Sequence, residues 1–215
     1  MRKRKNIYFI ITILICFTTQ LFSQQTNNDH KVFLLGNLEK LDIKSDYFKS
    51  LASEIKAVDG TYTVIVNGDF VGPAGLSIPS KPEETNRIDA LISLGSKNGK
   101  VVFIPGDKEW DDSGDDGKKK LSALEKYLDK NGGKNVKLYP RNNCLGPDMI
   151  KLNDHVQLLT INSQWLLQDK RVEEEDGKCG FLNDRELWGE LSDLLAKNDN
   201  RNLIVAIHHP LVSYG

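Results

Sequence analysis

The sequence predicts a layered α/β fold on three observations. Short runs of β-branched and other apolar residues alternate with stretches in which apolar residues recur every three or four positions. The apolar runs are almost unbroken, as expected of strands covered on both faces. The chain has 215 residues, 39% of them hydrophobic, which suffices for the core of one ordinary domain. We therefore expect a sheet core flanked by helices.

The expected elements alternate along the chain. Strands are predicted for the apolar runs at residues 32–35, 62–66, 101–104, 156–161 and 203–207. Helical spacing predicts helices over residues 44–56, 83–96, 118–130 and 184–197. In the last of these, Leu187, Leu191, Leu194 and Leu195 form one face. Acidic, glycine-containing stretches at residues 111–117 and 173–177 predict solvated loops.

The first 23 residues have the three parts of a secretion signal. Basic residues 2–5 precede the apolar run 7–17, and a polar exit follows with Ser23. We expect cleavage there, a mature domain over residues 24–215, no membrane span after cleavage, and a periplasmic, secreted or cell-surface location. An uncleaved membrane anchor is the alternative.

Removal of that segment leaves two cysteines, Cys144 and Cys179, both in turn-like sequence. In an exported protein they predict a single disulfide, with two free thiols as the alternative. The formal net charge is −1 with acids and bases interspersed, so the composition does not indicate a nucleic-acid partner.

Polar groups follow four of the predicted strands directly. They are Gly36-Asn37, Gly68-Asp69, Gly106-Asp107 and His208-His209. Ligands of open α/β sheets bind outside the carboxyl ends of the strands, so these endings are expected to converge. Mixed oxygen and imidazole ligands suit a pair of ions such as zinc, manganese or iron.

The order of these endings resembles the calcineurin-like metallophosphoesterases, in which an aspartate, Gly-Asp, Gly-Asn-His-Asp/Glu and a histidine follow successive strands. The block from Val101 to Trp110, the loop around Cys144 and the pair Gln164-Trp165 are similar to the purple-acid-phosphatase-like secreted branch. The resemblance implies an α/β/β/α sandwich that hydrolyses phosphate esters at two metal ions. It also implies that the chain covers the N-terminal portion of that domain, because the final Gly-His-x-His motif is not reached by Gly215.

Carried over by position, the resemblance makes Asp69 the aspartate that bridges both metals and His208 an imidazole ligand. Asn37 stands where the family has an aspartate, and Asp107 stands where it has an asparagine, so the number of carboxylates is kept. Asn37, Asp69, Asp107 and His208 are therefore the expected metal ligands.

Two further residues are expected to act on the substrate. Lys108 occupies the place of the histidine that contacts the phosphate, where a lysine holds charge but is a poor proton donor at neutral pH. His209 is expected to touch the substrate or to orient its loop. Trp110 and Trp165 either line a substrate cleft or pack in the core.

Two functions remain open on the sequence. The first is metal-dependent hydrolysis of a small phosphate ester, with activity reduced by the changes at Asn37 and Lys108. The second is a catalytically inactive domain that binds a phosphorylated or glycan ligand in the same cleft, or that serves as a module of a larger secreted or surface protein.

Overall fold

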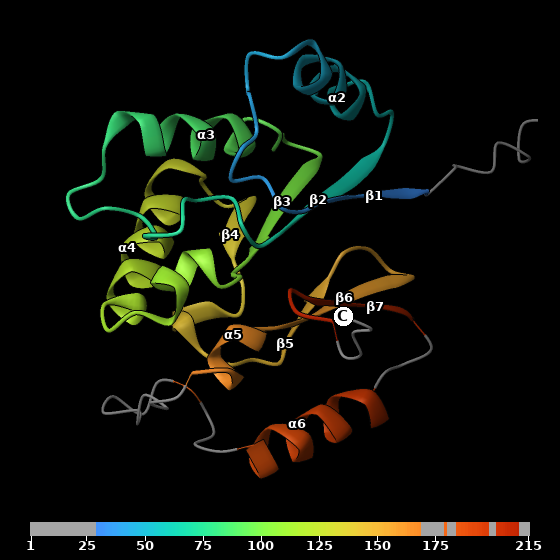
Figure 1. Cartoon of the computed structure of the whole chain (residues 1–215). Helices are drawn as coiled ribbons and strands as arrows, with labels where there is room; N and C mark the ends of the chain where they lie inside the picture. Colours follow the sequence, from blue (N-terminus) through green and yellow to red (C-terminus); the bar gives the residue numbers. More distant parts are fainter. Residues whose placement is uncertain (1–28, 169–178, 180–183, 198–200, 211–215) are drawn as a thin grey trace, which may run out of the picture.

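The computed structural model describes residues 29–168, 179, 184–197 and 201–210, arranged around two sheets (Figure 1). The predicted signal segment and the whole of the acidic stretch 173–177 lie outside the described residues. Within the described part of the chain, every helix is too short or too polar to cross a bilayer.

Sheet A is parallel throughout and has the order β1-β2-β3-β4. Its strands are β1 (His30–Leu35), β2 (Thr61–Asn67), β3 (Gly99–Ile104) and β4 (Val136–Leu138). Leu35 pairs with Val66, and Asn67 pairs with Ile104, so the first three strands end at the same edge. The loops that follow them therefore start side by side.

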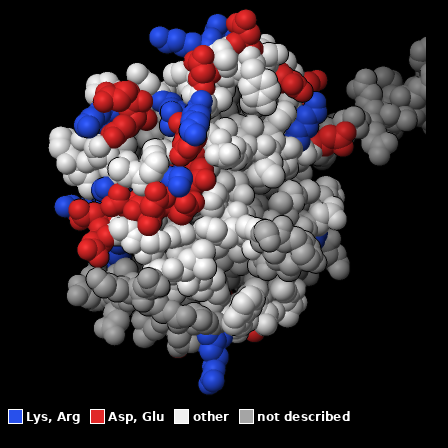
Figure 2. Space-filling view, in the orientation of Figure 1, with Lys and Arg blue, Asp and Glu red and all other residues white. Residues whose placement is uncertain are grey.

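Three helices connect these strands: α2 (Asp46–Lys56), α3 (Pro82–Ile92) and α4 (Gly117–Asn131). The Ser45 hydroxyl caps α2 by accepting a hydrogen bond from the Phe48 N–H. Pro82 stands at the first position of α3, where its missing N–H costs no hydrogen bond. On the face shown in Figure 2, acidic and basic side chains lie intermixed rather than in separate areas.

Sheet B consists of β5 (Asp148–Lys151), β6 (Val156–Ile161) and β7 (Asn202–Ile207). β5 runs antiparallel to β6, and β7 runs parallel to it. Ile161 pairs with Ile207, so β6 and β7 end together, and α5 (Ser163–Leu166) begins directly beyond β6. α6 (Asp184–Ala196) precedes β7, and Figure 1 shows it on the far side of sheet B from sheet A.

Alternate residues of the strands face two different cores. Ile65 of β2 and Leu158 of β6 belong to the cluster between the two sheets. Their neighbours Val64 and Leu159 belong to the larger cluster that includes the helices. Both faces of the central strands β2, β3 and β6 are therefore covered, whereas Leu34 of β1 and Val205 of β7 are exposed. Helices, sheet A, sheet B and α6 form successive layers, which confirms the predicted α/β class.

The long predicted elements are present with boundary shifts of a few residues, whereas β4 and β5 were not predicted. These two strands have only three and four residues, too few for a period to show in the sequence. The predicted loop at residues 111–117 begins instead within a 3₁₀ segment, η1 (Lys108–Ser113). Asp111 there is paired with Lys120 at 2.7 Å rather than free in solvent.

Cys144 and Cys179 form a disulfide with their Cα atoms 5.5 Å apart, as the sequence predicted. The bond joins the segment before β5 to the segment before α6. It ties the covering helix of sheet B to the sheet itself.

Candidate metal centre

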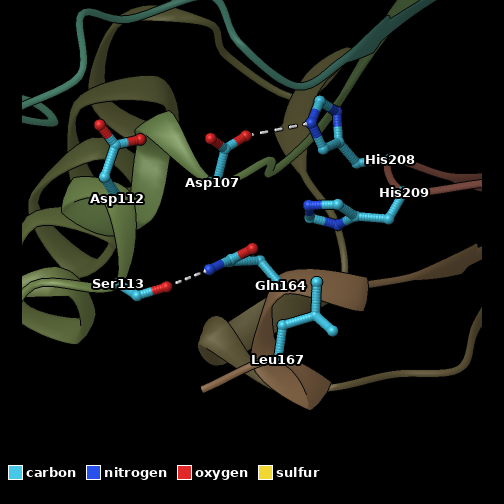
Figure 3. A pocket seen from close by; sticks show the side chains of 7 residues that line it. All are labelled: Asp107, Asp112, Ser113, Gln164, Leu167, His208 and His209. Atoms are coloured by element: carbon cyan, nitrogen blue, oxygen red, sulfur yellow. Dashed lines mark hydrogen bonds and ion pairs between the residues drawn. The ribbon is translucent and has the colours of Figure 1, made fainter. Parts of the chain in front are cut away.

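Three loops from two sheets meet at the carboxyl edge of the strands. Asp69 follows β2, Asp107 follows β3, and His208 and His209 follow β7. Asp107 and the two histidines offer ligand atoms that all lie within 4.8 Å of one another (Figure 3). Asp69 and Asp107 lie 101 to 140 positions from the two histidines along the chain, so the fold brings distant residues together.

Two glycines make this approach possible. A Cβ at Gly68 would overlap the His208 ring, and one at Gly106 would lie 2.7 Å from its Nε2. Gly68 also has φ of 74°, a conformation that side chains disfavour. The glycine before each aspartate thus lets the end of β7 close over sheet A.

His208 presents its Nε2 to both aspartates. Nε2 lies 3.3 Å from Asp107 Oδ1 and 3.6 Å from Asp69 Oδ1. Nδ1 lies 2.9 Å from the Asn67 carbonyl oxygen, which can only accept, so Nδ1 carries the proton. In the neutral ring this tautomer puts the lone pair on Nε2, as a metal ligand requires.

His209 is held by Ser163 at the start of α5. Ser163 Oγ lies 2.8 Å from His209 Nδ1 and accepts a hydrogen bond from the His209 backbone N–H at 3.1 Å. Burial, followed by the neighbouring His208, lowers the pKa of His209, so its ring is neutral at pH 7. A neutral imidazole turned by Ser163 is suited to ligate a metal ion through Nε2.

Asp69 has a carboxylate oxygen that lacks a partner. Its Oδ1 is buried and accepts no hydrogen bond from any described residue. Burial raises the pKa of Asp69, His208 opposes this, and the carboxylate of Asp107 raises it further. A buried carboxylate oxygen without a partner, close to a second carboxylate, destabilises the folded protein. A bound cation would remove this destabilisation. The donors present therefore fit a divalent metal ion.

Asp107 and Lys108 form an ion pair within the site. Lys108 Nζ lies 3.0 Å from Asp107 Oδ2 and 2.9 Å from Asp112 Oδ1. Burial alone would raise the pKa of Asp107, but hydrogen bonds, chiefly from Lys108, bring it well below its usual range. Hydrogen bonds to Asp112 and then to Asp107 raise the pKa of Lys108. Both groups are therefore charged at neutral pH.

Glu109 was given no role by the sequence, although it organises two of the loops. It is 1% exposed and accepts backbone N–H groups from Gly106 at 2.7 Å, Asp69 at 3.0 Å, Phe70 at 2.9 Å and Val71 at 3.1 Å. Burial raises the pKa of Glu109, and these four hydrogen bonds oppose the rise. In the sequence Glu109 stands among other charged residues, after Asp107 and Lys108 and before Asp111 and Asp112, so nothing set it apart.

The Asn37 side chain makes no hydrogen bond to the other expected metal ligands among the described residues. The backbone N–H of Leu38 donates to the Asp69 carbonyl at 2.7 Å, so the loop after β1 lies beside the loop after β2. The Asn37 side chain is exposed, and among the described residues it makes no hydrogen bond.

A cavity of about 610 Å³ opens beside these residues. It is lined by Asp107, Asp112, Ser113, Gln164, Leu167, His208 and His209 (Figure 3). Gln164 Nε2 donates to Ser113 Oγ at 2.6 Å, which fixes the wall opposite Asp107. Trp110 and Trp165 are 1% and 7% exposed and pack in the core, so the packing alternative holds for both.

A profile of the calcineurin-like phosphoesterase family matches residues 41–215. No curated protein and no solved structure matches the chain. The match spans well over half of the sequence and covers Asp69, Asp107, His208 and His209. The chain therefore belongs to the calcineurin-like phosphoesterase family.

Proposed function

We propose that this protein hydrolyses phosphate esters with a divalent metal ion held by Asp69, Asp107, His208 and His209. The observation that carries the proposal is the buried Asp69 Oδ1, which lacks a partner and faces His208 Nε2 at 3.6 Å. When bound, a metal ion supplies a water nucleophile at neutral pH and neutralises charge on the phosphoryl oxygens.

The protein residues divide the remaining tasks. Lys108 keeps its charge, so its ammonium group can hold a phosphate oxygen, but it is too weak an acid to protonate a leaving group effectively at neutral pH. Ser163 holds the His209 ring toward Asp107. Ser113 and Gln164 form a polar, uncharged wall that a substrate alcohol would contact.

The weak proton donor gives a specific expectation for substrates. General-acid help is worth about 10² to 10⁴ in rate, and aryl leaving groups need less of it than alkyl ones. The metal-loaded protein should therefore hydrolyse 4-nitrophenyl phosphate faster than an alkyl phosphate, and Asp69→Asn should abolish both reactions. Equal and rapid hydrolysis of both esters would contradict the assigned role of Lys108.

A catalytically inactive binding module is the second candidate. It is favoured by Lys108, whose pairing with Asp107 and Asp112 engages the group that would otherwise meet the substrate. The metal-loaded protein would then bind inorganic phosphate, detectable by calorimetry, while hydrolysing neither ester. Hydrolysis lost in Asp69→Asn would exclude this candidate.

We also propose that the protein is exported and belongs to the purple-acid-phosphatase-like secreted branch. The basic and apolar parts of residues 1–23 support export, and the Cys144–Cys179 disulfide suits an oxidising compartment. N-terminal sequencing of the exported protein should begin close to Gln24. Intact Met1 in a membrane fraction would instead show an anchor.

A further inference from the structure

Lys108 is held inside the site as a fixed positive charge. Its side chain is 22% exposed, and its Nζ lies within 3.0 Å of carboxylate oxygens from both Asp107 and Asp112. Asp107 belongs to the metal centre and Asp112 lines the adjoining cavity. The ammonium group therefore links a residue of the metal centre to a residue that lines the cavity.

The two oxygens of Asp107 face different groups, the imidazole of His208 and the ammonium group of Lys108. Oδ1 lies 3.3 Å from His208 Nε2, on the side where the imidazole lone pair and Asp69 converge. Oδ2 lies 3.0 Å from Lys108 Nζ. One oxygen is thus directed to a metal position, while the other is already engaged by an ammonium group.

The charges of the site balance with one divalent ion. Asp69, Asp107 and Asp112 contribute three carboxylates and Lys108 one ammonium group, a net charge of −2 from these four side chains. One divalent ion neutralises this charge, whereas two would leave an uncompensated excess of +2 in a partly buried site.

Asn37, one of the ligands expected from the sequence, brings no carboxylate to the site. Asn37 carries a neutral amide, is exposed, and makes no hydrogen bond with a described residue. A neutral amide oxygen is a weaker ligand than a carboxylate for such ions.

We propose that this site holds one divalent metal ion, between Asp69, Asp107, His208 and His209, and that the Lys108 ammonium group takes the place of a second. The inference rests on the proposed metal-dependent function and replaces the pair of ions expected from the sequence. A site with one ion and one lysine would bind a phosphate ester through a metal and an ammonium group.

The test is the number of ions bound by the whole chain. Titration of the metal-free protein with Zn²⁺ in a calorimeter should reach one ion per chain, and Mn²⁺ should give the electron paramagnetic resonance signal of an isolated ion. The double variant Lys108→Met, Asn37→Asp should bind two, with the Mn²⁺ signal broadened by spin coupling. Lys119→Met is the matched control, because Lys119 is exposed and its ion pair with Asp116 is as long as 4.0 Å. This variant should bind one ion per chain.

Each other result has a distinct meaning. Two ions in the wild-type protein would overturn the proposed count and leave the phosphoesterase function standing. One ion in both the wild-type protein and the double variant would show that Lys108 is not what excludes a second metal ion. No binding by the wild-type protein would overturn the metal-dependent function and this inference with it. The wild-type count tests the proposal even if the double variant fails to fold.

Discussion

Gly68 leaves room for the His208 ring because it carries no side chain, and Gly72 nearby has open space around it. Gly68→Ala would place a methyl group on the ring and force a residue with φ of 74° into a disfavoured conformation. We expect a loss of metal affinity of about 10- to 100-fold, the usual effect of disturbing the support of a ligand. Calorimetric titration with Zn²⁺ would measure it.

Gly72→Ala is the matched control for that variant. Nothing lies within 4 Å of a Cβ added at Gly72, so its Zn²⁺ affinity should equal that of the wild-type protein. Equal affinities for both variants would show that His208 is not a ligand, or that it does not need this contact.

Glu109 connects residues of two ligand loops through a single carboxylate. Glu109→Gln would turn an amide NH₂ toward backbone N–H donors, so at least one buried donor would lose its acceptor. We expect the free energy of unfolding to fall by about 2 to 3 kcal/mol, measured by urea denaturation. Glu54→Gln, on the exposed face of α2, should change it little; equal effects of the two would refute the role of Glu109.

The residues of the site differ in how far the sequence could identify them. Asp69, Asp107 and His208 stand directly after apolar runs, so strand prediction places them at a common edge. The role of Glu109 depends on backbone groups of Asp69 to Val71, which lie about 40 positions away and have no side-chain signature. Asn37 was predicted from its position alone, and its exposure became visible only in the fold.

Among the helices, α4 is attached to its neighbours by a charged clamp. Asp129 accepts two hydrogen bonds from Arg141, at 3.1 and 2.6 Å, and one from Lys137 of β4 at 2.7 Å. Arg141 begins η2 (Arg141–Asn143), and its backbone N–H also donates to Asp148 at the start of β5. The clamp therefore joins sheet A, its covering helix and sheet B.

The clamp predicts a pH dependence of stability. Hydrogen bonds from Arg141 lower the pKa of Asp129 below 3.8, with Lys137 acting in the same direction against burial. A carboxyl group whose pKa is lower in the folded than in the unfolded protein stabilises the folded state fully at pH values above its unfolded pKa. This stabilisation is lost as the pH falls through the folded pKa. The melting temperature of Asp129→Asn should therefore lie below that of the wild-type protein at pH 7, and the gap should narrow below about pH 4.

Asp193→Asn supplies the comparison, because Asp193 is exposed on α6. Its melting temperature should follow that of the wild-type protein at every pH. A gap between Asp129→Asn and the wild-type protein that stays constant down to pH 3 would show that the clamp does not depend on the ionised carboxylate.

The elements themselves were predictable in proportion to their length. α4 has 15 residues and β2 has seven, enough for their periods to be read from the sequence. β4 forms by pairing Val136 to Leu138 with β3, and β5 by pairing with β6. Such short strands are stabilised by partners distant in the chain, so local sequence carries little of the information.

At the scale of the whole molecule, the unbroken apolar runs correctly predicted that the central strands β2, β3 and β6 are covered on both faces, but Leu34 of β1 and Val205 of β7 are exposed. They did not reveal which residues face which layer, because Ile65 and Val64 are equally apolar. That division follows from the packing of sheet A on sheet B, which also brings His208 of one sheet to Asp69 and Asp107 of the other. The metal centre therefore depends on the two sheets staying together.

The disulfide links the segment before β5 covalently to the segment before α6. It joins positions 35 residues apart, and in the chain-entropy model closing a loop of that length in the unfolded state is worth about 4 kcal/mol. The variant Cys144→Ser, Cys179→Ser should lose roughly this much stability in urea denaturation, and reduction of the wild-type protein by dithiothreitol should cause a similar loss. Dithiothreitol should leave the variant unchanged, which separates reduction of this bond from other effects of the reagent. If the oxidised wild-type protein and the variant unfold at the same urea concentration, the bond does not stabilise the fold, and the attachment of α6 rests on its apolar face alone.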